Sequence, residues 1–258
     1  MHIALTIAGS DSGGGAGIQA DLKTFHRFGV FGTSVITAIT AQNTHGVTAW
    51  QPVDTALVAA QIDAVATDLR PAAVKSGMLG EAAVVRAVAE GIRRHGFTPY
   101  VLDPVMVATS GDLLLSGGAV EAIQRELLPL AALVTPNLDE AALLLGEPVR
   151  DVPAMERAAR WLVERGGAAA ALVKGGHLSG PESVDVLFDG ELHHFRHPRI
   201  DTTSTHGTGC TLSAAVAAHL SLGGSLRDAV ATSLDYVHRA IATAPRLGGG
   251  HGPLNHFA

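Results

Sequence analysis

The sequence has a single cysteine, Cys210, among its 258 residues, so an internal disulfide is excluded. Its first residues lack the basic and then apolar segments of a secretory signal. Glycine or a polar residue interrupts each apolar run before it reaches the ~20 residues that cross a bilayer. There are 18 Lys plus Arg against 24 Asp plus Glu, which leaves no basic excess to grip a nucleic-acid backbone. We therefore expect a cytoplasmic protein that binds neither membranes nor nucleic acid.

Several nucleotide-enzyme motifs are missing or incomplete. The chain has only three lysines, and none belongs to a Walker A loop, which excludes a P-loop enzyme. The segment Gly15–Ala20 fits the dinucleotide spacing G-x-G-x-x-A, but Val35–Thr40 lacks the acidic residue that would hold a ribose. Asp11 occupies the position where a hydrolase elbow needs serine. The sequence thus argues against a dehydrogenase and gives no support to an esterase.

What the chain does contain is a regular alternation of strand and helix patterns. The pattern begins with a strand at Ile3–Ala8, a helix at Ala16–Phe28 and a strand at Ser34–Thr40. Further helices are predicted after the capping residue Asp54, at Glu81–His95 with its end at Gly96, at about Gly118–Leu128 and at Leu226–Thr243. Strands separated by helices imply a parallel sheet. Asp189-Gly190, between two strand-like segments, predicts an antiparallel hairpin. We expect one α/β domain over residues 1–258, a three-layer α/β/α sandwich with a mostly parallel central sheet.

Seven loops that follow the predicted strands hold most of the chemically versatile residues. The carboxyl ends of parallel strands meet at one edge of a sheet, so these loops are expected to converge on a ligand. They are Gly9–Gly17, Gln42–Thr44, Lys75–Met78, Asp103–Met106, Pro136–Glu140, Lys174–His177 and His206–Cys210.

The segment around Cys210 carries the strongest signal for phosphate chemistry. Gly207, Thr208 and Gly209 form a flexible turn that leads directly into an apolar helix. Unpaired N–H groups and the positive helix end would bind a phosphate there and stabilise charge during phosphoryl transfer. The dipole is expected to lower the pKa of the Cys210 thiol from ~8.5 toward neutral, so that it could accept a proton. The alternative is a small cysteine packed behind a glycine turn.

Phosphoryl transfer also needs a divalent metal and positive charge. Asp103 at a strand end and Glu140 at the start of a helix are the candidate ligands for Mg²⁺. Each has a structural alternative, since Asp103 could shape the turn before Pro104 and Glu140 could stabilise the first turn of its helix. Lys174, at the end of an apolar strand, is placed to contact a phosphate as a point charge.

Six ordered motifs, which span nearly the whole chain, together resemble the hydroxymethylpyrimidine/phosphomethylpyrimidine kinases of the ribokinase-like superfamily. They are Ala8–Phe25, Thr37–Thr44, Asp103–Met106, Thr135–Glu140, Val173–His177 and Thr205–Ala215. The resemblance implies that ATP and Mg²⁺ serve to phosphorylate 4-amino-5-hydroxymethyl-2-methylpyrimidine to its monophosphate and then to its diphosphate, in thiamine biosynthesis. It also implies a homodimer.

The resemblance assigns roles to individual residues as well. Gln42 looks like the residue that hydrogen-bonds the aminopyrimidine edge, and the pocket would be lined by Gly9, Asp21, Met78 and Val105. Gly207–Cys210 resembles the anion hole, with Cys210 in the place of the aspartate base of sugar kinases. Asn137 and Glu140 match a magnesium and phosphate motif, while Lys174 and Thr208 would contact ATP.

Two other functions stay open from the sequence. A pyridoxal kinase of the same subfamily could share the cysteine-containing anion hole and phosphorylate a hydroxymethyl pyridine. A binding protein could use the same pocket for a nucleotide without catalysis.

Overall fold

The structure is a computed structural model and describes residues 1–106, 118–176 and 178–258. Within these ranges nine strands form one sheet in the order β3-β2-β1-β4-β5-β6-β7-β8-β9. The strands are β1 (Ile3–Ser10), β2 (Phe31–Asn43), β3 (Gly46–Pro52), β4 (Ala73–Ser76), β5 (Tyr100–Leu102), β6 (Leu133–Val134), β7 (Ala171–Val173), β8 (Glu182–Phe188) and β9 (Leu192–Pro198). The helices are α1 (Gly17–Arg27), α2 (Thr55–Asp68), α3 (Ala82–His95), α4 (Ala119–Ala122), α5 (Leu138–Leu145), α6 (Val152–Glu164), α7 (Thr208–Ser221) and α8 (Leu226–Ala242).

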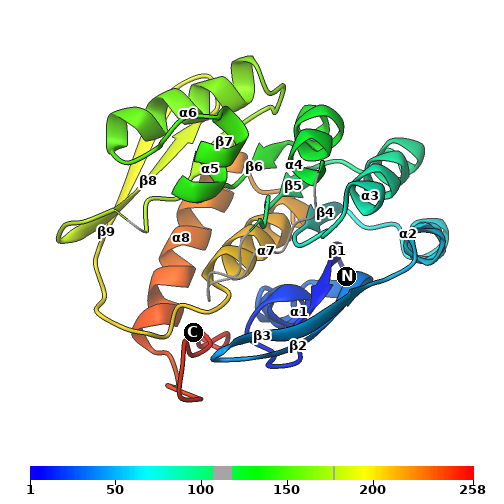
Figure 1. The fold of residues 1–258 in the computed structure, drawn as a ribbon, viewed down its shortest axis with the longest axis horizontal. Helices are drawn as coiled ribbons and strands as arrows, with labels where there is room; N and C mark the ends of the chain where they lie inside the picture. Colours follow the sequence, from blue (N-terminus) through cyan, green and yellow to red (C-terminus); the bar gives the residue numbers. More distant parts are fainter. Residues whose placement is uncertain (107–117, 177) are drawn as a thin grey trace.

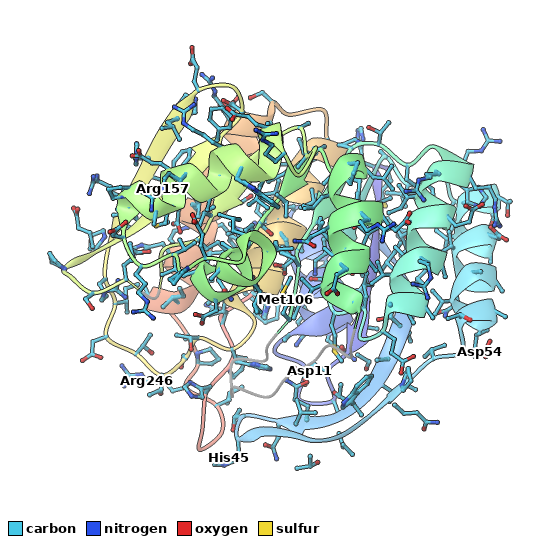
Figure 2. All side chains as sticks on the ribbon, turned by 45° about the horizontal axis from the view of Figure 1, so that its top comes forward. Asp11, His45, Asp54, Met106, Arg157 and Arg246 are labelled. Carbon is cyan, nitrogen blue, oxygen red and sulfur yellow. The ribbon has the colours of Figure 1, made fainter. Side chains whose placement is uncertain are left out.

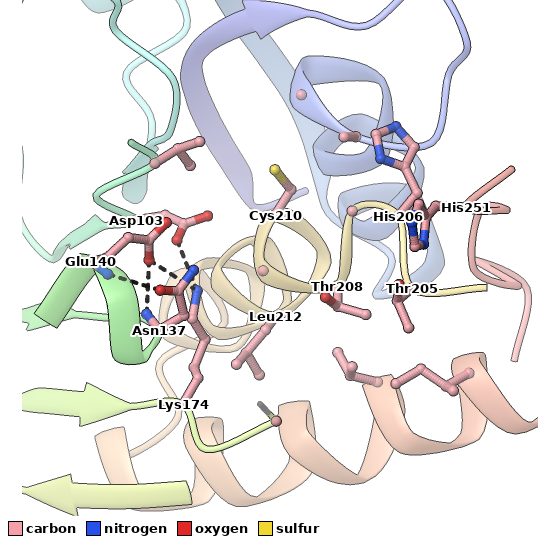
Figure 3. A pocket seen from close by; sticks show the side chains of 18 of the residues that line it. Asp103, Asn137, Glu140, Lys174, Thr205, His206, Thr208, Cys210, Leu212 and His251 are labelled. Carbon is pink, nitrogen blue, oxygen red and sulfur yellow. Dashed lines mark hydrogen bonds and ion pairs between the residues drawn. The ribbon is translucent and has the colours of Figure 1, made fainter. Parts of the chain in front are cut away.

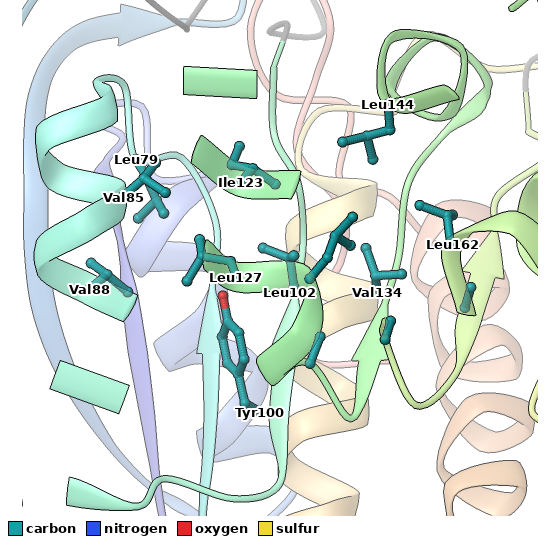
Figure 4. Packing of buried hydrophobic residues seen from close by; sticks show 14 of the residues in the cluster. Leu79, Val85, Val88, Tyr100, Leu102, Ile123, Leu127, Val134, Leu144 and Leu162 are labelled. Atoms are coloured by element: carbon teal, nitrogen blue, oxygen red, sulfur yellow. The ribbon is translucent and has the colours of Figure 1, made fainter. Parts of the chain in front are cut away.

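Helices cover both faces of the sheet and give the three layers visible in Figure 1. On one face α2 to α6 build a large core with Tyr100, Leu102 and Val134 of the sheet, shown in Figure 4. On the other face α1, α7 and α8 enclose a second core that includes Phe25 and Val101. Neighbours in β5 therefore point to opposite faces, as strand geometry requires. The predicted α/β/α sandwich with a mostly parallel sheet is confirmed.

Local signals explain why the predicted helices form where they do. Asp54 precedes α2, and its carboxylate accepts hydrogen bonds from the N–H groups of Ala56 and Leu57. Gly96 ends α3 in the left-handed conformation, with φ of +62°. Asn137 and the third residue after it form a capping box at the start of α5. Each of these three helix ends is thus set by residues that lie close to it in the sequence.

Two parts of the predicted topology need correction. The predicted strand Ser34–Thr40 is the middle of the longer β2, and β3, which the sequence did not predict, pairs antiparallel with it. Gln42 therefore lies on a strand rather than in a loop. The predicted helix Gly118–Leu128 begins as α4 and then changes to a π-helical turn, η1 (Ile123–Leu127), and a 3₁₀ turn, η2 (Leu128–Leu130). Pro129 lacks the N–H that would continue an α-helix.

The hairpin predicted around Asp189-Gly190 is confirmed as β8 and β9, which pair antiparallel. Strand β8 is also antiparallel to β7, so the ribbon closes one edge of the parallel sheet. In the part of the chain that the structure describes, no helix combines the length and apolar character needed to span a membrane.

Candidate active site

A pocket of about 670 Å³ lies at the carboxyl ends of the parallel strands. Each of the seven predicted loops contributes to its wall, and Figure 3 shows part of it. Of the predicted site residues, those that line it are Gly9, Gln42, Met78, Asp103, Val105, Asn137, Glu140, Lys174, Gly207, Thr208, Gly209 and Cys210. His177, in one of these loops, lies outside the described residues. The predicted convergence of the loops is confirmed.

Residues 207–210, hereafter the glycine turn, begin helix α7 beside the pocket. Gly207 has φ of +81°, and a Cβ there would collide with the carbonyl oxygen of Gly15. Only glycine fits this backbone and this close approach. The first N–H groups of a helix have no carbonyl partner inside it, and those of Gly209 and Cys210 stand in this first turn. The turn can therefore bind an anion through backbone groups and the helix dipole.

Asp103, Glu140 and Lys174 form an acid–lysine cluster next to the glycine turn (Figure 3). Lys174 Nζ lies 3.2 Å from Asp103 Oδ1 and 3.9 Å from Glu140 Oε2. Both carboxylates are almost fully buried. Burial disfavours the charged lysine, but Asp103 and Glu140 outweigh it and raise the Lys174 pKa. The ammonium thus stays charged beside a turn that favours anions.

The carboxylate of Asp103 is oriented by neighbours that the sequence did not reveal. Ser213 Oγ, one turn into α7, lies 3.2 Å from Asp103 Oδ2 and shares its proton with carbonyl oxygens of the same helix, and Thr135 Oγ1 donates to Oδ1 at 3.4 Å. These residues come from α7 and from the end of β6. Their contacts fix the direction in which Asp103 presents its charge to the pocket.

Glu140 stabilises the first turn of its helix, as the structural alternative predicted, and it also lines the pocket, where its role as a Mg²⁺ ligand stays a prediction. Its carboxylate accepts from the N–H of Asn137 at 2.8 Å, and its own N–H donates to Asn137 Oδ1 at 2.9 Å. Burial raises the pKa of Glu140 to about 7, with Lys174 opposing and Asp103 adding to the shift. The Asn-x-x-Glu pattern is therefore a capping box whose buried carboxylate also reaches the pocket.

The donor set fits a magnesium ion that is bound together with a nucleotide. Mg²⁺ in phosphoryl-transfer sites usually takes one or two carboxylates plus phosphate oxygens and water. Asp103 and Glu140 supply two carboxylates on one wall of the pocket. In the described ranges, no group of three or more His, Cys, Asp or Glu side chains is arranged to hold a metal.

Cys210 lies on α7 between the acid–lysine cluster and His206 (Figure 3). Burial raises the pKa of its thiol to about 12, and the opposing charge of Lys75 is the smaller effect. The prediction that the helix dipole lowers this pKa toward neutral is wrong, because the desolvation of a thiolate outweighs it. The raised pKa favours the neutral thiol of Cys210 over the thiolate that a general base would need.

All but one of the residues predicted to contact the pyrimidine line the pocket. A Cβ on Gly9 would lie 3.0 Å from Met78 Sδ, so the glycine allows these two strand ends to close together. Asp21, however, is fully buried and forms an ion pair with the fully buried Lys75 at 2.8 Å. The prediction that Asp21 lines the pocket is wrong, because the α1 side chain turns inward to neutralise this lysine.

Asp11 and His206 belong to two of the predicted loops, but the sequence assigned neither residue a role. Both line the pocket, and His206 Nε2 lies 2.8 Å from Asp11 Oδ2. They are 195 positions apart, so no local spacing indicates the contact. The only available signal was an aspartate inside a glycine-rich loop, a residue type that commonly binds nearby backbone N–H groups.

The fold and the site define a ribokinase-like kinase. Residues 11–255 match the phosphomethylpyrimidine kinase family, to which the chain belongs. It is 57% identical over 259 residues to the hydroxymethylpyrimidine/phosphomethylpyrimidine kinase of Rhizobium meliloti, covering 99% of this chain and 97% of that protein.

Two solved structures are similar over most of their length. The phosphomethylpyrimidine kinase of Clostridium difficile has a TM-score of 0.83 and 41% identity, covering 93% of this chain and 100% of that one. The pyridoxal kinase of Bacillus subtilis has a TM-score of 0.92 and 37% identity, covering 99% and 97%. The fold is thus shared by kinases of both names.

Proposed function

We propose that this chain uses ATP to phosphorylate 4-amino-5-hydroxymethyl-2-methylpyrimidine and then its monophosphate, in thiamine biosynthesis. The observation that carries the proposal is the position of Lys174 against the glycine turn. A Cβ on Gly209 would lie 3.0 Å from Lys174 Nζ, so a fixed cation and the N–H groups of a helix start act at one place. That arrangement suits the charge that develops on a transferring phosphoryl group.

The nucleobase of ATP is proposed to occupy the apolar end of the pocket. Side chains of α7 and α8 meet there with the segment after β9. The wall consists of Leu212, Leu234, Val237, Ile241, Pro198 and Ile200. An apolar slot suits a planar base, and it leaves the triphosphate to extend toward Asn137, Lys174 and Thr208.

The pyrimidine is proposed to bind at the opposite end, between Gly9, Gln42, Met78 and Val105. A carboxamide donates and accepts side by side, which suits an aminopyrimidine edge. Thr40 Oγ1, which donates to the carbonyl oxygen of Ser10 at 2.8 Å, lies 3.3 Å from Gln42 Oε1 beside this carboxamide. Gln42→Ala is therefore expected to raise the KM for the pyrimidine by about tenfold, with less effect on ATP.

In the proposed mechanism the chain positions the reactants and stabilises charge. The glycine turn and Lys174 hold the γ-phosphoryl group, and Asp103 and Glu140 would hold Mg²⁺, which supplies charge neutralisation on the phosphates. Phosphoryl transfer has a loose transition state, so positioning contributes more than proton abstraction. The neutral Cys210 thiol is proposed to orient the attacking hydroxyl, in place of the base that the resemblance implied. As the O–P bond to ADP breaks and the new O–P bond forms, the hydroxyl proton passes to an oxygen of the transferred phosphoryl group.

Three further properties belong to the same proposal. The whole chain acts as one kinase domain, which is supported by a single sheet that includes every described strand. The enzyme is proposed to be a cytoplasmic homodimer, in keeping with its single cysteine and its family. Sedimentation of the purified protein tests the dimer independently of activity.

A pyridoxal kinase is the second candidate function, because the Bacillus subtilis pyridoxal kinase is similar over 99% of this chain. Steady-state kinetics with each acceptor, at saturating Mg²⁺ and ATP, separates the two. The proposal expects a higher kcat/KM for the pyrimidine than for pyridoxal. A higher kcat/KM for pyridoxal would contradict it, and an absence of ATP turnover with both would favour a binding protein.

A further inference from the structure

His206 is the contact point of three segments that are far apart in the sequence. It precedes the glycine turn, its ring reaches Asp11 in the loop 9–17, and its N–H donates to the carbonyl oxygen of Gly252 at 3.1 Å. Figure 2 shows Asp11, His45 and Arg246 on the same side of the molecule. The start of α7 is therefore connected both to the first loop and to the last residues of the chain.

The Asp11 carboxylate accepts four hydrogen bonds. It accepts from the N–H groups of Gly13 at 2.8 Å, Gly15 at 3.0 Å and Ala16 at 2.8 Å, and from His206 Nε2 at 2.8 Å. Burial disfavours its charge, but the bonds from His206 and the backbone prevail and lower its pKa. One buried carboxylate thus fixes the path of the loop 9–17 and the direction of the His206 ring.

The backbones of the two loops also touch directly. A Cβ on Gly15 would lie too close to His206 Cδ2, and a Cβ on Gly207 would meet the carbonyl oxygen of Gly15. The glycine turn therefore rests on the loop 9–17 without side chains between them. His206 directly precedes Gly207, the N-cap of α7, so its contacts with Asp11 and with the loop 9–17 act next to the start of that helix.

The C-terminal segment, residues 247–258, holds the other side of His206. His206 pairs with Pro253 in a short parallel bridge, and the N–H of His251 donates to the carbonyl oxygen of Thr44 at 2.7 Å. Thr44 lies in the turn between β2 and β3, two residues after Gln42. The same network therefore touches both the phosphate end and the pyrimidine end of the pocket.

We propose that His206, through its hydrogen bond to Asp11, is a positioning residue that holds the glycine turn in the place where it stabilises the transferring phosphoryl group. This inference rests on the proposed kinase function, and it adds a residue that acts through the glycine turn rather than on the reacting atoms. Because the turn acts on charge that develops in the transition state, the loss of its alignment lowers kcat more than it raises KM.

The test compares three substitutions of His206 by their kcat and by their KM for pyrimidine and ATP. His206→Leu keeps bulk but cannot donate, His206→Asn is too short to reach Asp11, and His206→Gln can place a donor near the position of Nε2. The Leu and Asn variants are expected to lose at least about tenfold in kcat, with each KM within about threefold of the wild type. The Gln variant is expected to recover most of kcat.

His194→Leu is the matched control. His194 Nε2 also lies 2.8 Å from a carboxylate, that of Glu156, but both residues are outside the pocket wall. The control is expected to leave kcat unchanged. If His206→Leu fails to fold, the comparison of kcat between His206→Gln and His206→Asn decides. Both side chains are polar amides, but only that of Gln is long enough to reach Asp11.

Equal kcat in the Gln and Asn variants, or a kcat within twofold of wild type in the Leu variant, would overturn the proposal. The proposal would also be overturned if a fall in melting temperature accounted for the lost activity of the Leu and Asn variants and the Gln variant recovered no kcat. Failure of the wild type to phosphorylate the pyrimidine would contradict the proposed function instead, and the His206 series would then be measured on pyridoxal phosphorylation.

Discussion

The ammonium group of Lys174 lies 3.2 Å from a carboxylate oxygen of Asp103. The pair joins the ends of β5 and β7 across β6, and it stands against the first turn of α7. Neither charge is stable alone in this buried place, since an unpaired buried ion is costly. The ion pair thus keeps a lysine charged, at low exposure, where a phosphoryl group is proposed to pass.

Replacing Lys174 by methionine is expected to lower kcat/KM for ATP by about two orders of magnitude, as found when one fixed donor to a developing oxyanion is removed. Initial rates at varied ATP measure the effect. Lys23→Met is the control, because Lys23 is exposed and bonds only the carbonyl oxygen of Gly14 among the described contacts. An unchanged kcat/KM in Lys174→Met would contradict the assigned role.

Gly207→Ala is expected to lower activity at least about a hundredfold, because the new Cβ displaces the glycine turn from the Gly15 carbonyl. Gly223→Ala is the matched control: its φ of +85° is nearly the same, but no atom lies within 4 Å of the added Cβ. That control is expected to cost about 1 kcal/mol of stability through backbone strain alone and to keep activity. Thermal melts and initial rates of both variants check the contrast, and equal loss of activity in both would refute it.

The raised pKa of Cys210 predicts slow alkylation. At pH 8 a thiol with a pKa of about 12 rather than 9.0 has roughly a thousandfold less thiolate. Iodoacetamide labelling of the folded protein, followed by mass spectrometry, measures the rate. The same single cysteine in denaturant is the control. Equal rates in both states would show that the thiol is not held neutral.

Cys210→Ala is expected to lower kcat about tenfold, with little change in either KM, because the thiol is proposed to orient the attacking hydroxyl. The kcat of the wild type should not follow a thiolate titration between pH 7 and 9. A rise of about tenfold per pH unit over this range, absent from Cys210→Ala, would instead show that the thiolate acts as a base.

The lowered pKa of His256 predicts that the stability of the protein depends on pH. Burial lowers its pKa from 6.5 to about 4, with a smaller effect from Lys23. The unfolded chain therefore binds the proton first, so stability is fully present above pH 6.5 and falls as the pH drops toward 4. The contribution is at most about 3.5 kcal/mol, from about 1.4 kcal/mol per pKa unit.

Urea unfolding of wild type and His256→Gln at several pH values isolates this contribution, since other groups titrate in both. The difference between the two free energies of unfolding should shrink as the pH falls from 6.5 to 4. A difference that stays constant over this range would contradict the assignment to His256.

The elements that were predicted correctly are those set by neighbouring residues. The cap at Asp54, the left-handed Gly96 and the apolar spacing of α3 act within a few positions, and they gave helix bounds close to those observed. Strand β3 was missed because Gly46–Pro52 is largely exposed and has no clear alternation of apolar and polar residues. Its pairing with β2 depends on tertiary context.

The site was predicted as a set of loops, but not in its internal contacts. Strand-end motifs indicated Asp103, Lys174 and the glycine turn, because parallel strands place their ends together. The Asp11–His206 contact and the burial of Asp21 arise from residues distant in sequence. The Cys210 pKa was wrong in sign for the same reason, since desolvation is known only after the chain is packed.

The central claim is the choice of acceptor, and a competition measures it most directly. Purified protein would be incubated with Mg²⁺, ATP and equal amounts of hydroxymethylpyrimidine and pyridoxal, and the products identified by mass spectrometry over time. The account predicts that the pyrimidine monophosphate appears first and is converted to the diphosphate. Pyridoxal phosphate without any pyrimidine diphosphate would contradict it.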